Sequence, residues 1–282
     1  MSDGVGGPAA HRLAVLGSPI AHSKSPALHR AAYAALGFDW QYEAVEVASA
    51  GLAEFVGSRD ASWRGLSLTM PLKQEVLPLV DELDRRARLT GAANTLRFDG
   101  RRRLGFNTDV GGIVGALADA GVTASARAGV VGGGATAASA IAAIAELGAS
   151  EVEVFVRTPA RAAALEPLAG SLGLRIVVRR LDELSGAGGL DLVVATVPGG
   201  TELGVRPSAA LIEGAALLEV AYDPWPSPLA AAWLDGGGTV VHGLGMLLHQ
   251  ALLQVRVFAN GDPELPLPGE AEVLAAMRSA IA

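Results

Sequence analysis

The sequence predicts an α/β fold with parallel strands, arranged in two domains, and three observations support this class. Short apolar runs alternate with helix-like patterns through most of the chain, which is the order of strands joined by helices. The chain has 282 residues, a length that suits two domains of ordinary size. A glycine-rich turn, Gly132-Gly133-Gly134, lies between a strand-like run and a helical pattern.

Composition excludes several classes of protein. Hydrophobic residues make up 50% of the chain and charged residues 18%, so the chain is neither a disordered tail nor a coiled coil. With 22 basic and 29 acidic residues the formal net charge is -7, and such a surface repels nucleic acid and anionic lipid. The lack of cysteine excludes a disulfide scaffold, a thiolate zinc site and a cysteine nucleophile.

Two uncharged stretches, 128–145 and 236–255, raise the question of a membrane span, and neither qualifies. The first is mostly alanine and glycine, and the second is interrupted by glycines, histidines and glutamines. The first ten residues contain no basic segment followed by an apolar one, so no secretory signal is expected. The sequence therefore predicts a cytoplasmic protein that makes no contact with a membrane.

The first part of the chain begins with a strand, a loop and a helix. Ser25-Pro26 suits the start of that helix, with Ser25 as the N-cap and the proline in the first turn. Asp99-Gly100 is typical of a hairpin turn, and Gly121 suits the end of a helix. The patterns predict strands over 13–16, 41–47, 66–68, 93–98 and 103–106, and helices over 25–36 and 110–119.

A second series of alternating strands and helices follows Gly121. Its patterns predict strands over 128–131, 152–156, 174–178, 190–195, 216–220 and 239–241, and helices over 135–147, 159–168, 243–258 and 270–281. The change of domain then falls inside the helix at 110–120, and the last helices are expected to return to the first domain. We therefore expect one domain of residues 1–110 with 243–282, and a second of 111–242.

The glycine-rich turn fits a dinucleotide-binding motif. Residues 130–137 match G-x-G-x-x-G/A between a strand and a helix, where glycines let the backbone approach a pyrophosphate and the helix N-terminus supplies amides. The motif alone is weak, but its place in a strand–helix–strand series supports a nucleotide site. The second domain is therefore expected to be a Rossmann-type doubly wound domain.

The end of the next strand bears on which nucleotide is bound. An NAD site usually carries an acid there, whereas this strand ends with Val156 followed by Arg157 and Thr158, and Arg161 lies one turn later. Guanidinium groups suit the dianionic 2′-phosphate of NADP. The alternative is a pair of solvated surface arginines. The sequence favours NADP over NAD.

Only two of the 22 basic residues are lysines, Lys24 and Lys73, so arginine is used wherever a positive charge suffices. A retained lysine is a candidate for reversible deprotonation, which arginine cannot perform, although chance explains Lys24 equally well. Residues 65–73 place Ser67, Thr69 and Lys73 at the carboxyl end of a strand, where α/β proteins bind ligands. Asp109 starts a helix and, taken alone, is most simply an N-cap.

These motifs together resemble the shikimate dehydrogenase family, and the resemblance runs nearly from end to end. Six signatures occur in the family's order: Gly17-Ser18-Pro19-Ile20-Ala21-His22-Ser23-Lys24-Ser25-Pro26, Ser67-Leu68-Thr69-Met70-Pro71-Leu72-Lys73, Gly91-Ala92-Ala93-Asn94-Thr95, Asn107-Thr108-Asp109, Arg157-Thr158 with Arg161, and Gly243-Leu244-Gly245-Met246-Leu247-Leu248-His249-Gln250. The family's fold implies an N-terminal α/β substrate domain followed by a Rossmann-type NADP-binding domain.

The resemblance also implies roles for individual residues. Lys73 would accept and donate the proton of the ring hydroxyl, and Asp109 would orient it. The substrate would be bound by Ser23 and Ser25 at its carboxylate and by Ser67, Thr69, Asn94, Tyr222 and Gln250 elsewhere. NADP would contact Gly132, Gly133, Gly134, Ala135 and Thr136 at its pyrophosphate, Arg157, Thr158 and Arg161 at its 2′-phosphate, and Thr196, Val197, Val220, Gly243 and Met246 at its remaining parts.

Three positions depart from the family's pattern. Ser67 stands where asparagine is usual, which shortens one contact to the substrate and could widen substrate choice. Val156 replaces an asparagine, and Glu219 stands where aspartate is common. No pair of histidines has support as zinc ligands, so no metal is expected.

The resemblance implies NADP-dependent, reversible reduction of 3-dehydroshikimate to shikimate by hydride transfer, a step of aromatic amino-acid (chorismate) biosynthesis. The partners would be small molecules, with no nucleic acid and no membrane, and the chain a monomer or homodimer. A quinate or amino-shikimate dehydrogenase of the same fold is one alternative. Another is a catalytically silent NADP-sensing protein, which would be expected to lack Lys73 or Asp109.

Overall fold

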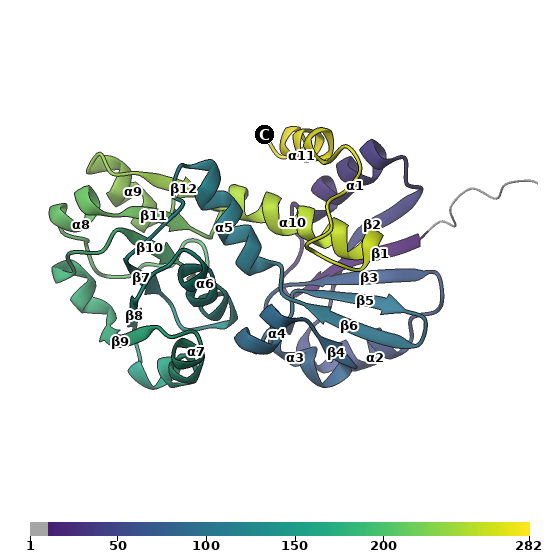
Figure 1. Cartoon of the computed structure of the whole chain (residues 1–282), viewed down its shortest axis with the longest axis horizontal. Coiled ribbons are helices and arrows are strands. Elements are labelled where there is room, and N and C mark those ends of the chain that lie inside the picture. Colours follow the sequence, from purple (N-terminus) through teal and green to yellow (C-terminus); the bar gives the residue numbers. More distant parts are fainter. Residues whose placement is uncertain (1–10) are drawn as a thin grey trace, which may run out of the picture. The chain divides into compact units, whose positions relative to one another are not determined.

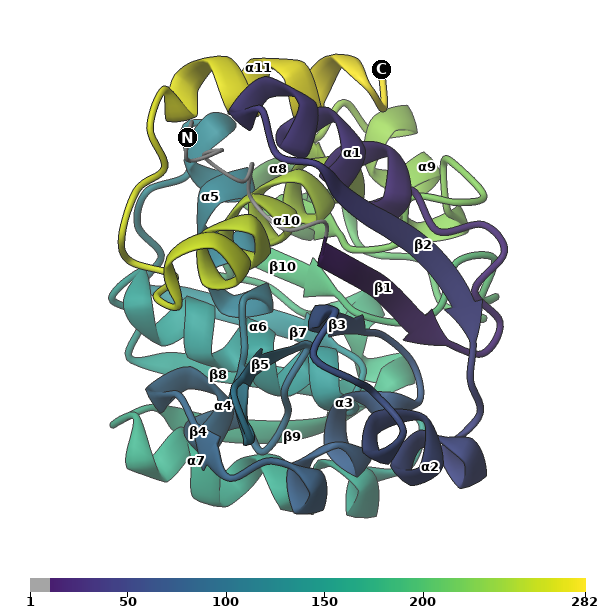
Figure 2. The same cartoon turned by 90° about the vertical axis from the view of Figure 1, so that its right-hand side faces the viewer.

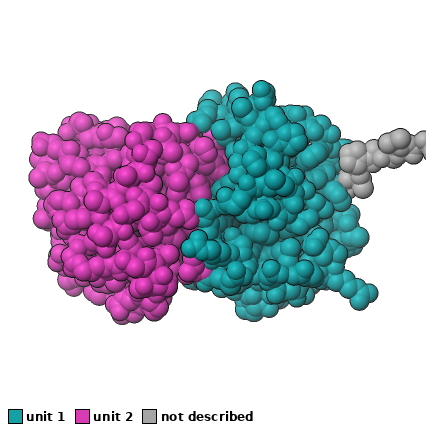
Figure 3. Space-filling view, viewed as in Figure 1, with its two compact units in different colours: residues 1–88, 92–108, 251–282 teal, residues 89–91, 109–250 magenta. Residues whose placement is uncertain are grey.

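The computed structural model describes residues 11–282, with the backbone alone of Arg161. The first ten residues, for which no secretory signal is expected, lie outside the described part. The chain forms two compact units (Figure 3). Unit 1 contains the residues up to Arg88, Ala92–Thr108 and Ala251–Ala282, and unit 2 contains Leu89–Gly91 and Asp109–Gln250. No helix within residues 11–282 combines the length and the apolar character that a membrane span requires.

Unit 1 is built on a six-stranded mixed sheet in the order β2-β1-β3-β5-β6-β4. The strands β1, β2 and β3 run parallel, and β5 pairs antiparallel with both β3 and β6. Gly100, at a φ of 60°, lies in the two-residue turn between β5 and β6, as the hairpin signal predicts. The strands are β1 (His11–Gly17), β2 (Trp40–Glu46), β3 (Trp63–Leu68), β4 (Glu82–Leu83), β5 (Thr95–Asp99) and β6 (Arg102–Phe106).

Helices cover both faces of this sheet (Figure 1). The helices on one face are α1 (Ser25–Leu36), the part of α10 (Gly243–Asn260) from Ala251 onward, and α11 (Glu270–Ser279), which packs beside α1 (Figure 2). The other face packs against α2 (Leu52–Gly57), α3 (Leu72–Glu75) and α4 (Arg85–Thr90). Alternate strand residues divide between the two faces, and Ala14, Leu16, Leu66 and Leu68 belong to the core on the α2 side.

Unit 2 contains a six-stranded, wholly parallel sheet in the order β12-β11-β10-β7-β8-β9. Its strands are β7 (Arg127–Val131), β8 (Glu151–Val156), β9 (Arg175–Arg180), β10 (Leu192–Ala195), β11 (Ala216–Glu219) and β12 (Val240–His242). The helices α5 (Asp109–Asp119), α6 (Ala135–Glu146) and α7 (Glu166–Ser171) cover one face, and α8 (Ala209–Gly214) and α9 (Pro228–Asp235) the other (Figure 1). The predicted Rossmann-type doubly wound sheet is confirmed.

Two local predictions are wrong. Ser25 is the first residue of α1 and Lys24 its N-cap, because the hydroxyl that accepts an amide there is that of Ser23, 3.3 Å from the Ser25 nitrogen. Residues 159–168 do not form one helix: a 3-10 helix, Pro159–Leu165, is followed by α7. Pro167 lacks an amide hydrogen and its ring would collide with a carbonyl one turn earlier in a continuous α-helix.

The division into units falls at the start of one helix and inside another. It lies between Thr108 and Asp109, at the start of α5, and between Gln250 and Ala251, inside α10. The expected boundaries were after residue 110 and before residue 243. Helix α10 therefore belongs to both units, with its first residues in unit 2 and its last in unit 1.

Candidate active site

Two polar loops of unit 1 follow the carboxyl ends of β1 and β3, and backbone hydrogen bonds hold these two segments together. The Thr69 amide donates to the Leu16 carbonyl at 2.9 Å, and the Ser18 amide donates to the Met70 carbonyl at 3.0 Å. A side chain at Gly17 would bring a Cβ to 2.4 Å from Cγ2 of Thr69, so only glycine allows this approach. The contact fixes Thr69 next to the loop that carries Ser23.

Two serine hydroxyls lie at the beginning of α1. Ser25 is buried and Ser23 half-buried, and the Ser23 hydroxyl accepts the Ser25 amide. The first turn of a helix presents unpaired amides and the positive end of the helix dipole. Hydroxyls and amides together suit an anionic group such as a carboxylate.

Lys73 lies in α3, directly after the β3 loop. Its carbonyl accepts the Ala93 amide at 2.8 Å, which ties α3 to the segment that enters β5. The Lys73 side chain is half-buried. Unit 1 therefore brings Thr69, Lys73 and Asn94 together where β3 ends and the antiparallel β5 begins.

Asn94 is 2% exposed and its amide is held in one orientation. Its Oδ1 accepts the Thr95 hydroxyl and the Thr108 amide, each at 2.9 Å. Its Nδ2 donates to Oγ1 of Thr108 at 2.9 Å. These donors and acceptors distinguish the oxygen of the amide from the nitrogen, so Asn94 presents a defined pattern to a ligand.

Asp109 is the first residue of α5 and belongs to unit 2, whereas Lys73 belongs to unit 1. Asp109 is 3% exposed and lies inside the helix as its first residue, so the N-cap role considered from sequence gives way to a buried carboxylate in the first turn. The preceding Asn107 donates its amide nitrogen to the Ala92 carbonyl at 3.1 Å. This bond anchors the segment from which α5 begins.

The glycine-rich turn of unit 2 has the geometry of a phosphate loop. Gly132 follows β7 at a φ of 121°, and a Cβ there would lie 2.5 Å from Oγ1 of Thr196. Its amide donates to the Phe155 carbonyl at 3.0 Å. Gly134 is the N-cap of α6, so the amides of the first turn of that helix, at Ala135 and Thr136, border the turn with Gly133. A dinucleotide pyrophosphate fits this loop.

The end of β8 carries the cations expected there. Arg157 and Thr158 are exposed directly after Val156, and the backbone of Arg161 lies in the following 3-10 helix, while its side chain lies outside the described part. No aspartate or glutamate occurs between Val156 and Leu165. This strand end suits a phosphate better than a ribose hydroxyl pair.

The remaining cofactor candidates lie in unit 2, directly after the ends of β10, β11 and β12. Thr196 follows β10 and donates its hydroxyl to the Val131 carbonyl at 3.0 Å, with Val197 next to it. A Cβ at Gly243 would lie 2.3 Å from the Val220 carbonyl oxygen, so the start of α10 packs directly on the end of β11. Met246 is buried one turn into that helix.

Glu219 ends β11 with a buried carboxyl group. It accepts the Ser227 hydroxyl at 2.5 Å and the Ala221 amide at 3.3 Å, and burial raises its pKa above the ordinary value. These bonds close the loop that contains the half-buried Tyr222. Gln250, in α10, donates its side-chain amide to the Leu247 carbonyl at 2.8 Å.

Sequence reasoning missed Tyr42 and Gln254, two buried side chains that the structure links to Ser67 and Asn94. Tyr42, Ser67 and Gln254 form a buried chain of hydrogen bonds that ends at Asn94 and Thr95. The one available signal was the second glutamine of α10, one turn after Gln250 in an otherwise apolar stretch. The role expected for Ser67 in binding substrate is taken up again below.

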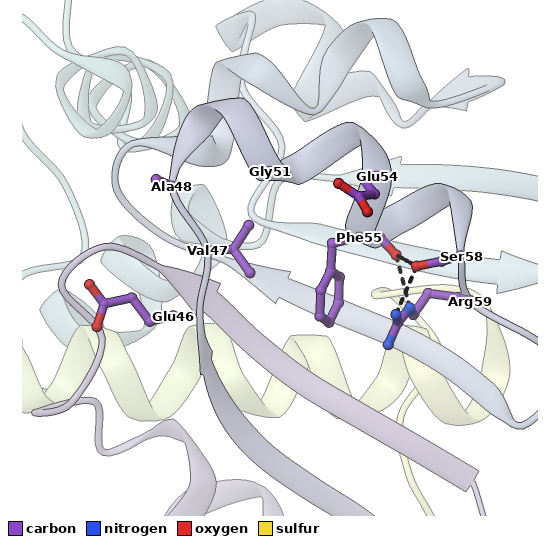
Figure 4. A pocket seen from close by; sticks show the side chains of 8 residues that line it. All are labelled: Glu46, Val47, Ala48, Gly51, Glu54, Phe55, Ser58 and Arg59. Carbon is purple, nitrogen blue, oxygen red and sulfur yellow. Dashed lines mark hydrogen bonds between the residues drawn. The ribbon is translucent and has the colours of Figure 1, made fainter.

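One open pocket of unit 1 lies apart from these residues (Figure 4). Figure 4 shows Phe55 and Arg59 beside each other, with the Arg59 guanidinium bonded to the Phe55 carbonyl and to Ser58. None of the residues predicted from sequence lines it, and its lining residues are Glu46, Val47, Ala48, Gly51, Glu54, Phe55, Ser58 and Arg59. Within residues 11–282 no group of three or more histidine, aspartate or glutamate side chains is arranged to hold a metal ion.

Comparison with known proteins finds relatives in the family that the sequence motifs resemble. Residues 15–96 match the family model of the shikimate dehydrogenase substrate binding domain. The NADP(+) shikimate dehydrogenase of Rubrobacter xylanophilus is 38% identical over 264 residues, which is 89% of this chain and 91% of that protein.

Two solved structures extend the likeness to three dimensions. The Mycobacterium tuberculosis shikimate dehydrogenase is 39% identical, with a TM-score of 0.81 over 95% of this chain and 99% of that one. The Thermus thermophilus shikimate 5-dehydrogenase, solved in complex with NADP(H) and shikimate, is 33% identical, with a TM-score of 0.80 over 96% of this chain and 99% of that one. The similarity therefore covers both units.

Proposed function

This chain belongs to the shikimate dehydrogenase family, and from this premise we propose that it reduces 3-dehydroshikimate reversibly to shikimate with NADPH, a step of aromatic amino-acid biosynthesis. The observation that carries the proposal is the match over nearly the whole chain to the Thermus enzyme that holds both NADP(H) and shikimate. That match covers 96% of this chain and 99% of the Thermus enzyme.

The residues of unit 2 fit NADP. The glycine turn suits a pyrophosphate, with Gly133, Gly134 and the first amides of α6 as donors and open space where a Cβ of Gly134 would lie. In this proposal Arg157, Thr158 and Arg161 bind the 2′-phosphate, and Thr196, Val197, Val220, Gly243 and Met246 bind the rest of the molecule. When bound, the cofactor supplies or accepts the hydride.

The substrate residues divide by the chemistry of their side chains. Ser23 and Ser25 donate hydrogen bonds to the ring carboxylate at the start of α1. Thr69, Asn94, Tyr222 and Gln250 hold the ring hydroxyls. This pattern matches a polyhydroxylated ring acid because each hydroxyl both donates and accepts.

Lys73 performs the proton transfer in this mechanism. When shikimate is oxidised, the Lys73 amine takes the proton of the reacting hydroxyl, and in the reverse direction the ammonium returns it to the carbonyl oxygen. Arginine could not do so because its pKa is above about 12. In this proposal Asp109 accepts a hydrogen bond from the part of the substrate that carries the reacting hydroxyl, and it orients Lys73.

The activity test is an initial-rate assay that combines shikimate and quinate with NADP and NAD. Turnover with shikimate and NADP alone is the expected result. A preference for quinate would move the assignment to the paralogous activity. A protein that binds NADP but turns over neither ring acid would favour the sensing protein, which the presence of both Lys73 and Asp109 argues against.

Two substitutions of Lys73 test its proposed role. Lys73→Ala should lower kcat by roughly 100- to 10,000-fold, the usual contribution of general acid–base catalysis, with a smaller effect on shikimate binding. Lys73→Arg keeps the positive charge but should be equally inactive. Near wild-type turnover by either variant would contradict the role.

The remaining expectations concern where and in what form the enzyme works. The substrates of this proposal are small, water-soluble molecules, which is consistent with a cytoplasmic enzyme that binds neither nucleic acid nor membrane. As proposed here, each chain carries its full set of site residues, so a monomer or a homodimer would be active. Sedimentation equilibrium with parallel rate measurements distinguishes the two forms.

A further inference from the structure

A buried chain of hydrogen bonds runs beneath Asn94 in unit 1. The Tyr42 hydroxyl lies 2.6 Å from Oγ of Ser67, and that Oγ lies 2.8 Å from Oε1 of Gln254. The Gln254 Nε2 lies 3.0 Å from both the Asn94 carbonyl oxygen and Oγ1 of Thr95. These five residues are at most 3% exposed, so their polar groups depend on one another for partners.

The sheet register brings the chain together. Tyr42 on β2 is opposite Leu13 of β1, and Ser67 on β3 is opposite Val15, so both point to the face that α1 and α10 cover. Gly65 lies on the same face, and a Cβ there would come within 2.4 Å of the Phe258 ring. The missing side chain lets α10 pack close to β3, which brings Gln254 within reach of Ser67.

The donors in this chain all point in one direction. The Ser67 hydroxyl donates its one hydrogen to the carbonyl oxygen of Gln254. In the bond between Tyr42 and Ser67 the Tyr42 hydroxyl must therefore be the donor. The amide nitrogen of Gln254 then donates to Thr95, whose hydroxyl donates to Oδ1 of Asn94 at 2.9 Å. The order of donors therefore starts at Tyr42 and ends at the amide oxygen of Asn94.

His29 on α1 reports the same order. Its ring stacks on Tyr42 at a centroid distance of 3.9 Å, and its Nε2 lies 3.2 Å from Oε1 of Gln254. Because that oxygen is an acceptor, Nε2 carries the hydrogen and Nδ1 accepts the Tyr33 hydroxyl at 3.1 Å. Burial lowers the pKa of His29 to about 3, so the neutral ring has one defined tautomer.

We propose that Tyr42, Ser67 and Gln254 are positioning residues, which act through the Thr95 hydroxyl and, together with Thr108, fix the orientation of the Asn94 amide and so the hydroxyl pattern it presents to substrate. Ser67 acts through this chain rather than by touching the substrate itself. The inference rests on the proposed function in one respect, the role of Asn94 in binding a ring hydroxyl. It explains how a serine serves at a position where asparagine is usual in the family.

Kinetics of four variants test the proposal. Tyr42→Phe, Ser67→Ala and Gln254→Met each interrupt the chain and should raise KM for shikimate by roughly three- to tenfold, the value of one buried hydrogen bond. The KM for NADP and kcat should change less than about twofold, because the lost orientation affects substrate binding alone. Ser67→Thr keeps the hydroxyl and should restore the wild-type KM.

Tyr33→Phe is the matched control. It removes another buried phenol hydroxyl next to His29, but one that lies outside the chain to Asn94. Its KM for shikimate should equal that of the wild type. Thermal unfolding of each variant shows whether it is folded, and Gln254→Met replaces Tyr42→Phe in the comparison if the latter does not fold.

The Tyr42 variant distinguishes the proposal from the alternative in which Ser67 contacts the substrate directly. If Ser67 touches the substrate, Ser67→Ala raises KM while the buried Tyr42→Phe leaves it unchanged, and the proposal is overturned. Equal effects of the two variants, with the double variant no worse than either, support the chain. An equal rise in KM for Tyr33→Phe would show a general packing effect and would also overturn it.

A spectroscopic measurement is independent of activity. The nitrogen chemical shifts of His29 in the wild-type protein should show a hydrogen on Nε2 and none on Nδ1, and Gln254→Met should remove this preference. The opposite tautomer in the wild type would reverse the donor order and contradict the proposal. If the wild-type protein does not oxidise shikimate, the proposed function fails while this measurement still decides the donor order.

Discussion

His29 is a neutral histidine enclosed in unit 1. The ring is 0% exposed, and burial outweighs the hydrogen bond that Nε2 donates to Gln254 in setting its pKa at about 3, against an ordinary value of 6.5. The unfolded chain takes up the proton at the ordinary value, whereas the folded protein does not. Stability from this residue is therefore complete above pH 6.5 and is lost as the pH falls from there towards 3.

The substitution His29→Gln should remove this pH dependence. Below pH 6.5 the wild type should lose up to about 1.4 kcal/mol of unfolding free energy per pH unit relative to the variant, or about 2 kcal/mol by about pH 5. Glutamine can still bond to both Gln254 and Tyr33, so the variant should fold. Urea unfolding at several pH values measures the difference, and parallel curves for the two proteins would contradict it.

The contribution of Glu219 to stability depends on pH in the opposite sense to that of His29. The residue is 1% exposed, and burial raises the pKa of its carboxyl group in spite of the bonds from Ser227 and Ala221. Because the folded protein holds the proton more tightly than the unfolded chain, stability is greatest below the ordinary pKa of 4.5 and falls as the pH rises through the raised value.

Glu219→Gln should therefore gain stability relative to the wild type as the pH rises from about 4 to about 8. The glutamine stays neutral over this interval and can bond to the same two partners. The measurement is the difference in unfolding free energy between the two proteins at both ends of the interval. A difference that does not change with pH would show that Glu219 has an ordinary pKa in the folded protein.

At the scale of elements, the turn between β7 and α6 depends on one glycine more than on its neighbours. Gly132 has a φ of 121° and a Cβ would lie 2.5 Å from Thr196, whereas a Cβ at Gly134 would meet nothing within 4 Å. A side chain at Gly132 must therefore distort both its own backbone and the start of the loop after β10.

Gly132→Ala should lower the unfolding free energy by about 1–3 kcal/mol and weaken NADP binding by at least about tenfold. Gly134→Ala is the control for folding and should cost about 1 kcal/mol or less, the price of a poorer N-cap. Denaturant unfolding and a titration with NADP measure the two effects. Equal stability of the two variants would contradict the conformational argument.

The strands and the glycine loop could be predicted because their signals are local. Apolar runs and the residues that end them lie next to each other in sequence, and every predicted strand occurs in the structure. The short helices α2, α4, α8 and α9 were missed because one or two turns carry too little periodicity to detect. At 159–168 the apolar pattern concealed the break that Pro167 requires.

The buried chain beneath Asn94 could not be predicted for a different reason. Ser67 and Gln254 are 187 residues apart, and only the packing of α10 on β3 brings them together. The family pattern suggested a substrate contact for position 67 because it records which residue is usual there, not what surrounds a replacement. The site residues themselves were predicted from sequence motifs, and both their membership of the site and their roles are proposals that the kinetic tests address.

At the scale of the whole molecule, helix α10 connects the stability of the two units. Its residues up to Gln250 belong to unit 2 and those from Ala251 to unit 1, without a break in the helix. If one unit unfolded alone, the helix would have to end at the division and lose the backbone hydrogen bonds that cross it. We therefore expect the units to unfold together.

Tryptophan fluorescence can follow each unit separately, because Trp40 and Trp63 belong to unit 1 and Trp225 and Trp233 to unit 2. NADP at about a hundred times its Kd should add about 2.7 kcal/mol to the unfolding free energy. In variants that keep the tryptophans of one unit only, with phenylalanine at the others, both reporters should shift to the same higher denaturant concentration. A shift confined to the unit 2 reporter would show that α10 breaks at the division and that NADP stabilises only the unit that binds it.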